Sequence, residues 1–168
     1  LADEIVLIAI LRAGLGMVEG ALRVVPEARV GHLGMYRDED SLMPVGYYEN
    51  VPDGVADAEV VVVDPMLATG GSAVNALDRL KAAGARRLRL VCLVAAPEGL
   101  EAVHRAHPEV PITCAAVDRQ LDDRGRTHGA LHVAVELNLR QRVVGVTIAH
   151  RCERQYMDRW SGSSRLRR

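Results

Sequence analysis

The sequence has little of several features that would assign it to a class of protein. Its 168 residues contain one lysine, Lys81, and no long uninterrupted apolar run. Because a membrane-spanning helix needs about 20 mostly apolar residues, no membrane span is predicted. The opening segment LADEIVLIAIL has acids before its apolar residues and no basic stretch, so it is not read as a secretory signal. It lacks a starting Met and enters a predicted strand almost at once, which leads us to expect a fragment truncated at its N-terminus.

Patterns typical of metal sites are absent as well. The three cysteines are far apart and form no CxxC pair, and the six histidines show no HExxH spacing, so no protein-held metal is predicted. Cys92 and Cys114 lie inside apolar, strand-like runs, and we interpret them as buried thiols of a protein in a reducing cytoplasm. His104 and His107 are expected on a surface helix, without a matching acid or third ligand, and are interpreted as structural.

The length fits one domain, and a hydrophobic content of 49% suits a globular protein. The net charge of −1 is unevenly spread along the chain. Residues 1–120 carry 11 Lys and Arg against 17 Asp and Glu, or −6, whereas residues 121–168 carry 10 against 5, or +5. A basic end of this kind can bind polyanions. For the basic residues of this end we favour an out-of-frame reading of the gene, argued below, and we do not expect a nucleic-acid partner.

The first 117 residues alternate between apolar stretches typical of buried strands and amphipathic stretches typical of helices. Several strand candidates, such as VVVV at 60–63, are continuously apolar, as expected of parallel strands covered on both faces. We predict strands at Glu4–Leu11, Ala28–Tyr36, Glu59–Asp64, Arg87–Ala95 and Ile112–Val117, and helices at Leu15–Val24, Gly71–Ala83 and Glu98–Ala106. This order indicates an α/β domain with a mostly parallel sheet and helices on both faces.

The alternation stops between residues 37 and 54, where the chain reads RDEDSLMPVGYYENVPDG. This stretch is polar and contains two prolines and two tyrosines, so it is predicted to be a loop. A loop this long inside a compact domain is either disordered or a functional lid. Its acidic run, Asp38 to Asp40, is interpreted as a solvated face rather than a metal site.

The strongest chemical signal is VVVVDPMLATGGSAVNAL, residues 60–77. A predicted strand ends in Asp64, and a short loop, Ala68 to Ser72, opens a helix. Gly70 and Gly71 allow the backbone to approach an anion closely, and the free N–H groups of the first helical turn favour negative charge. An acid at the carboxyl end of a parallel strand faces the crevice where open α/β sheets bind ligands. The pattern therefore predicts a phosphate site; the alternative is a glycine-rich turn that caps a helix and binds nothing.

The segment DPMLATGGS, Asp64 to Ser72, resembles the phosphoribosyl-pyrophosphate (PRPP) signature of type I phosphoribosyltransferases in its uracil-specific form, with Pro65 where many relatives have a second acid. Further segments similar to uracil phosphoribosyltransferases occur in the family's order: ILRAGLGM (10–17), GMYRDE (34–39), LVAAPEGL (93–100) and AHPEV (106–110). The resemblance implies a type I phosphoribosyltransferase-like α/β fold and the transfer of a phosphoribosyl group from PRPP to uracil. The products would be UMP and pyrophosphate, in pyrimidine salvage.

The resemblance also implies roles for particular residues. Asp64 would lie at the ribose hydroxyls and act in catalysis, and Arg12 and Arg37 would hold the pyrophosphate, although each arginine could instead have a structural or solvated role. Mg²⁺ would be carried by the oxygens of PRPP rather than by a protein cage. The complete PRPP-binding set is Arg12, Arg37, Asp64, Pro65, Met66, Leu67, Ala68, Thr69, Gly70, Gly71 and Ser72.

The similarity stops at about residue 125. The family continues with a PGLGDAGD-like segment that recognises uracil, and this chain lacks it, so no uracil-binding residues are predicted. Residues 121–168 contain ten arginines and no lysine, as an out-of-frame reading of a GC-rich gene would give. The alternatives are a diverged specificity segment, since LHVAVEL and VVGVTIA could form strands, or a basic arm. We therefore divide the chain into a PRPP-binding core (1–125) and a divergent basic tail (126–168).

Three hypotheses follow for function. The first is a cytoplasmic uracil phosphoribosyltransferase, homo-oligomeric in its intact form, whose present chain binds PRPP without turning over. The second is a non-catalytic PRPP- or nucleotide-binding regulator with an RNA-contacting tail, and the third is a remnant that binds nothing.

Overall fold

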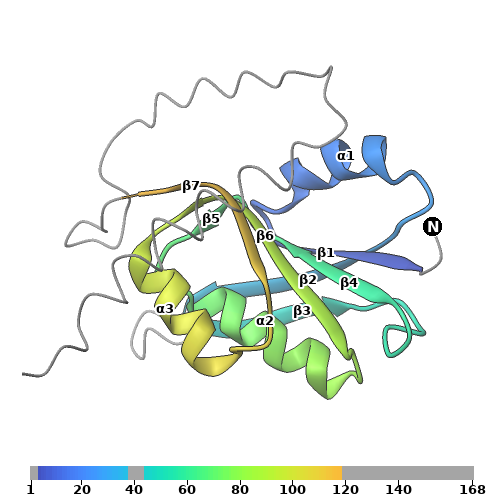
Figure 1. The fold of residues 1–168 in the computed structure, drawn as a ribbon. Helices are drawn as coiled ribbons and strands as arrows, with labels where there is room; N and C mark the ends of the chain where they lie inside the picture. Colours follow the sequence, from blue (N-terminus) through green and yellow to red (C-terminus); the bar gives the residue numbers. More distant parts are fainter. Residues whose placement is uncertain (1–3, 38–43, 119–168) are drawn as a thin grey trace, which may run out of the picture.

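The computed structural model describes residues 4–37 and 44–118, which form a seven-stranded sheet and three helices (Figure 1). The predicted boundary at residue 125 and the tail 126–168 lie outside these residues. The elements follow one another as β1 (Ile5–Leu11), α1 (Leu15–Val24), β2 (Arg29–Arg37), β3 (Pro44–Asn50), β4 (Glu59–Val63), β5 (Met66–Leu67), α2 (Gly71–Ala82), β6 (Arg87–Ala95), α3 (Pro97–Ala106) and β7 (Ile112–Val117).

The strands are ordered β3-β2-β1-β4-β6, with β5 and β7 also pairing with β6. Val94 and Ala95 of β6 pair with both β5 and β7, so these two strands lie along opposite edges of β6 and β5 continues the line of β4. All pairings are parallel except that of β2 with β3. The prediction of a mostly parallel α/β sheet is confirmed.

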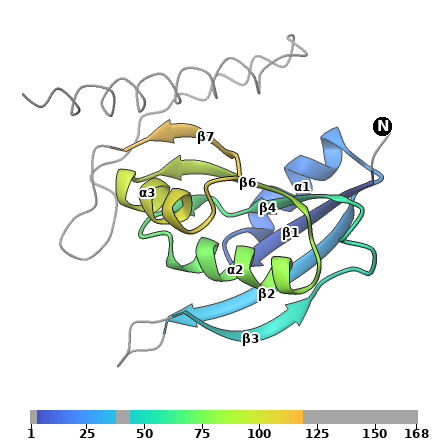
Figure 2. The same cartoon turned by 60° about the horizontal axis from the view of Figure 1, so that its bottom comes forward.

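Helices cover both faces of the sheet, as predicted. On one face, Ile8 of β1 packs with Val62 of β4 and Leu77 of α2, all of them fully buried, in the larger core that α2 and α3 close. On the other face, Ala9 and Val63 pack against α1 in a smaller core. Figures 1 and 2 show α1 on one side of the sheet and α2 and α3 on the other. The period-two change of face along β1 is the reason its neighbours Ile8 and Ala9 belong to different cores.

The prediction of a loop over residues 37–54 is wrong in its central part, because Pro44–Asn50 form the strand β3, which pairs antiparallel with β2. Polar sequence misleads here because β3 is an edge strand with largely exposed side chains, including Tyr47 and Tyr48. Pro44 is tolerated as the first residue of an edge strand, where no ladder N–H is needed. The ring of Tyr47 packs over Gly34 of β2, where a Cβ would lie 2.7 Å from it. Residues 38–43 lie outside the described ranges.

The other predicted elements agree with the structure to within one residue at each end, and α1, β6 and β7 match at both ends, whereas the two-residue strand β5 was not predicted. Gly84, with φ of +96°, follows the last turn of α2 in the left-handed conformation that commonly ends a helix. Cys92 and Cys114 are buried free thiols at paired positions of β6 and β7. None of the helices in the described ranges is long and apolar enough to cross a membrane.

The assignment of His107 to a helix surface is wrong. His107 follows α3 as its C-cap residue and is only 3% exposed. Its Nδ1 lies 2.6 Å from Nζ of Lys81, and its Nε2 lies 3.3 Å from a carboxylate oxygen of Asp78. Lys81 also bonds Glu109, whose pKa is lowered by that hydrogen bond. These contacts tie the end of α2 to the segment before β7, so His107 has a structural role, as predicted, but from a buried position with an acid beside it.

Candidate active site at the carboxyl edge of the sheet

The turn after β1 and the end of β4 meet at one edge of the sheet. β1 and β4 pair in parallel, with Ala9 opposite Val63, so Arg12 and Asp64 follow neighbouring strand ends. The turn presses against β4 at Gly14, where a Cβ would lie 2.6 Å from the carbonyl oxygen of Val63. Arg12 is exposed in this turn, and its peptide bond with Leu11 is cis. A cation and an acid predicted from separate motifs therefore lie at the same edge of the sheet.

Asp64 is half-buried directly after β4. Burial raises the pKa of its carboxyl group from 3.8 to about 6, although the backbone N–H of Met66, 3.5 Å from Oδ1, acts in the opposite direction. Burial has this effect because a low dielectric disfavours the charged form. An acid with a pKa raised toward neutral, at the carboxyl end of a parallel strand, is a candidate functional group.

The first part of the predicted phosphate loop is anchored to β6. The carbonyl oxygen of Pro65 accepts hydrogen bonds from the N–H groups of Leu93 and Val94, at 3.1 and 3.0 Å. The Leu67 side chain is 2% exposed in the larger core, and its carbonyl oxygen accepts a 2.8 Å bond from the N–H of Ala96. Within the predicted binding set, Pro65 and Leu67 therefore fix the base of the loop, and Met66 between them is exposed.

The two glycines of the loop differ in what surrounds them. Gly70 has φ of +83°, a left-handed conformation, and a Cβ there would lie 2.8 Å from the Cβ of Ala102 on α3. Gly71, the first residue of α2, has open space in its Cβ direction, with only the Thr69 hydroxyl at 3.9 Å. Gly70 thus satisfies a requirement of the fold, whereas Gly71 leaves space free at the start of α2.

The first turn of α2 is available to a ligand. No side chain caps this helix, and Thr69 and Ser72 are exposed beside it. The first N–H groups of any α-helix lack intrahelical partners, and the positive end of the helix dipole lies there. The loop from Ala68 to Ser72 therefore combines an uncapped helix start with two exposed hydroxyl-bearing residues, which suits a phosphate group.

Arg37 lies farther out. It is the last residue of β2 and pairs with Pro44, three residues beyond Gly34, where the pairing with β1 ends. Three strand residues span about 10 Å. The backbone of Arg37 thus lies along the β2–β3 hairpin rather than beside Asp64, and its side chain lies outside the described atoms.

Sequence reasoning missed the contribution of α3 to the loop. Gly99 is buried in the first turns of α3, and a Cβ there would overlap the carbonyl oxygen of Ala68 and lie 2.9 Å from that of Leu67. The sequence does contain this glycine within the family-like segment LVAAPEGL (93–100), but the segment alone does not indicate what Gly99 contacts. The phosphate loop therefore rests on α3 at Gly99 and, through Gly70, at Ala102.

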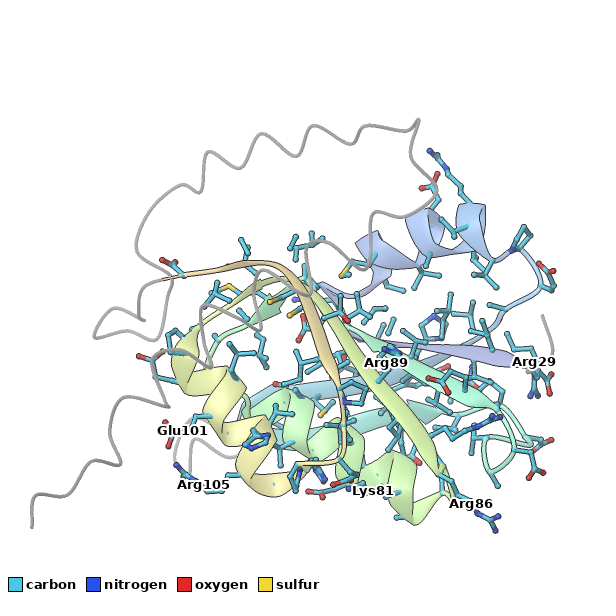
Figure 3. All side chains as sticks on the ribbon, in the orientation of Figure 1. Arg29, Lys81, Arg86, Arg89, Glu101 and Arg105 are labelled. Atoms are coloured by element: carbon cyan, nitrogen blue, oxygen red, sulfur yellow. The ribbon has the colours of Figure 1, made fainter. Side chains whose placement is uncertain are left out.

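Charged side chains gather elsewhere too. Lys81 and Arg86 extend from the end of α2 and the turn before β6, and Arg29 begins β2 (Figure 3). Lys81 and Arg86 line a cavity of about 130 Å³ together with Glu59 and Glu109. These positions lie at the amino ends of the strands, on the opposite edge from the loop. In the part of the chain that the structure covers, no three His, Cys, Asp or Glu side chains are grouped as a metal site.

The fold matches those of solved structures, a phosphoribosyltransferase among them. The AQ2163 protein of Aquifex aeolicus superposes with a TM-score of 0.69 and 44% identity, over 73% of this chain and 59% of that one. A purine phosphoribosyltransferase from Pyrococcus horikoshii superposes with a TM-score of 0.56 over 68% of this chain and 71% of its own, at 20% identity. That second likeness concerns the fold alone.

Sequence relatives are more specific. The uracil phosphoribosyltransferase of Salinibacter ruber is 56% identical over 123 residues, covering 73% of this chain and 59% of its own length. That of a Thermoanaerobacter species is 57% identical over 119 residues, covering 71% and 57%. This chain thus spans just under three fifths of these relatives. The family model described as uracil phosphoribosyltransferase matches residues 1–131. With that match over more than half its length, the chain belongs to the uracil phosphoribosyltransferase family.

Proposed function

We propose that residues 4–118 are the PRPP-binding part of a uracil phosphoribosyltransferase, which transfers the phosphoribosyl group of PRPP to uracil. One observation carries the proposal. The loop after β4 is fixed by the hydrogen bond of Leu67 to Ala96 and by the packing of Gly70 on α3, whereas Gly71, near the half-buried Asp64, has almost no contacts in its Cβ direction. A rigid loop with an open helix N-terminus next to an acid fits a sugar phosphate, because it offers separate partners to the phosphate and to the ribose.

The 5′-phosphate of PRPP is assigned to the loop from Ala68 to Ser72. Backbone N–H groups at the start of α2 would donate to its oxygens, and the hydroxyls of Thr69 and Ser72 would add two donors. Thr69 and Ser72 are exposed residues and α2 has no side-chain cap, and both observations support this assignment. Asp64 would accept hydrogen bonds from the ribose hydroxyls in its ionised form.

The pyrophosphate is assigned to Arg12 and Arg37. Arginine suits this role because its planar guanidinium binds phosphate oxygens with two parallel hydrogen bonds. Mg²⁺ would enter with PRPP, bound to the oxygens of the substrate, and would neutralise part of the charge of the leaving group. The position of Arg12 in the turn beside the end of β4 supports its part in this assignment.

The chemical step would form one bond and break one. The N1 atom of uracil would bond to C1 of the ribose while the C1–O bond breaks, and pyrophosphate would leave with the electron pair of that bond. Positive charge develops on the sugar in such a step, and a carboxylate near the ring stabilises it. Asp64 can do this only when ionised, that is, at pH values above about 6. The proton of N1 would pass to solvent or to a general base.

The uracil site is not assigned to any described residue. The chain spans just under three fifths of its curated relatives, and residues 119–168 lie outside the described ranges. We therefore propose PRPP and uracil as the partners of the complete protein, which we expect to be homo-oligomeric. For this chain alone we propose binding of PRPP without turnover. A cytoplasmic location is proposed because Cys92 and Cys114, at paired positions, are unbridged.

Isothermal titration calorimetry of the whole chain with PRPP and Mg²⁺ tests the proposal. Circular dichroism first establishes that the sample is folded. We expect a saturable heat and a rise in melting temperature, since a ligand that binds only the native state stabilises it. A folded sample that gives neither heat nor thermal shift at millimolar PRPP would contradict the proposal.

A further inference from the structure

A single arginine joins the phosphate-loop helix to the β2–β3 hairpin. Arg79 lies in the third turn of α2, and its Nη1 donates to Oε2 of Glu49 on β3 at 2.6 Å. Its Nε donates to Oδ1 of Asn75, one turn earlier in α2, at 3.1 Å. The Arg79 side chain is 37% exposed and that of Glu49 is 43% exposed. Asn75 thus orients the guanidinium within α2, and Glu49 accepts a hydrogen bond from it on the neighbouring strand β3.

The guanidinium also lies on the backbone of β3. A Cβ at Gly46 would overlap the Arg79 guanidinium, with its Cζ at 2.7 Å, so glycine is the residue that leaves room for it. Among the described strands, β3 pairs only with β2. The contact with Arg79 is therefore a second attachment of the edge strand, to a helix on one face of the sheet, and Figure 2 shows α2 beside this hairpin.

The attachment lies close to a proposed ligand residue. Gly46 pairs with Met35, and Arg37 is two residues farther along β2, where it pairs with Pro44. Two strand residues correspond to about 7 Å. The helix that holds Arg79 begins at Gly71 in the proposed 5′-phosphate loop. One side chain thus links the helix that begins in the proposed 5′-phosphate loop to β3, the strand that pairs with β2 and its residue Arg37.

We infer that Arg79 is a positioning residue: it sets the distance between the loop at Ala68–Ser72 and the hairpin that carries Arg37. This inference rests on the proposed function. Ribose 5-phosphate occupies only the loop and Asp64 in that proposal, whereas pyrophosphate depends on Arg12 and Arg37. Loss of the Arg79 contacts frees the hairpin without touching the loop, so the two ligands should respond differently.

The test compares the two ligands on the whole chain. Affinities for ribose 5-phosphate and for Mg²⁺–pyrophosphate are measured by calorimetry for the parent, Arg79→Met, Arg79→Lys and Glu49→Gln. For Arg79→Met we expect pyrophosphate binding to weaken about threefold to fivefold, with ribose 5-phosphate affinity unchanged within about twofold. Arg79→Lys should lose nearly as much, because lysine cannot bond Asn75 and Glu49 with one planar group. Glu49→Gln keeps the fold of α2 intact and should lose less.

Arg105→Met is the matched control. It removes an exposed i,i+4 ion pair with Glu101 within α3, which does not involve the hairpin, and should change neither affinity (Figure 3). Equal weakening of both ligands by Arg79→Met and by Glu49→Gln would overturn the inference, because it would show a general effect on the fold. Unchanged pyrophosphate affinity in both variants would overturn it too. A parent that binds neither ligand would refute the proposed function, and the inference with it.

Discussion

The Cβ of Ala102 lies 2.8 Å from the position that a Cβ on Gly70 would occupy. Gly70 is the only loop residue from 65 to 72 with positive φ, and it also packs closely on α3. Its neighbour Gly71 is free of such contacts. This difference separates substitutions that damage the fold from those that fill the ligand space.

The variant Gly71→Val should fold and lose PRPP binding. The new side chain meets only the Thr69 hydroxyl at Cβ distance, so the folded protein accommodates it, but it projects into the space proposed for the 5′-phosphate. Calorimetry should detect no PRPP heat, while the melting temperature without ligand stays within a few degrees of the parent. Parent-like affinity would show that the loop does not hold the phosphate.

The variant Gly70→Val should instead destabilise the protein itself. A non-glycine residue in the left-handed conformation costs on the order of 1–2 kcal/mol, and the overlap with Ala102 adds to that cost. Urea denaturation should therefore give a free energy of unfolding at least about 2 kcal/mol below the parent. A stability equal to that of Gly71→Val would contradict the distinction between the two glycines.

Gly99→Ala should both destabilise the chain and weaken PRPP binding. The added methyl group overlaps the carbonyl oxygen of Ala68, so either α3 or the loop has to move. Gly20→Ala in α1 is the matched control, because a Cβ there meets nothing within 4 Å. The control should stabilise the helix by up to about 1 kcal/mol and leave binding unchanged. Similar behaviour of the two variants in thermal melts and calorimetry would be evidence against the role of α3.

Asp64 predicts a dependence of stability on pH. Its pKa is about 6 in the folded chain and 3.8 ordinarily, so the folded state binds more protons between these values. Stability therefore falls as pH rises from about 4 to 6, by on the order of 3 kcal/mol from this group. Asp64→Asn removes the loss and should be more stable than the parent at pH 7.5 but not at pH 4. Urea titrations at both pH values measure this, with the exposed Asp53→Asn as a control that should show no such difference.

Turnover is expected to be absent from the chain as given. Specific acceptance of a base needs donors and acceptors aimed at its edge, and these are not assigned to any described residue. Radiolabelled uracil with PRPP should give no UMP above background. Activity should appear when the flanking segments of a longer relative, such as that of Salinibacter ruber, are joined to residues 5–118. Robust UMP formation by the chain alone would refute this prediction and make residues 126–138 the first to mutate.

Local patterns in the sequence were sufficient for most of the fold. Buried apolar runs identified β6 and β7 to the residue, and the strand-acid-glycine pattern placed Asp64 beside an open helix start. The edge strand β3 was missed because its exposed side chains carry no alternation of polarity. Contacts between Gly99 and Ala68, and between Arg79 and Gly46, were not predicted because each joins residues about thirty positions apart, and nothing local marks such pairs. Whether Arg37 and the other site residues act as proposed remains a prediction.

The supports of the loop at residues 64–72 come after it in the chain: Leu93 and Val94 on β6, Ala96, and then Gly99 and Ala102 on α3. During synthesis on a ribosome, the signature segment therefore emerges before anything that can hold it in shape. Domains generally fold as units once their partners are available. The nascent chain should acquire its phosphate site only after residue 106 has left the exit tunnel, and a messenger cut short before that point would yield the signature without the site.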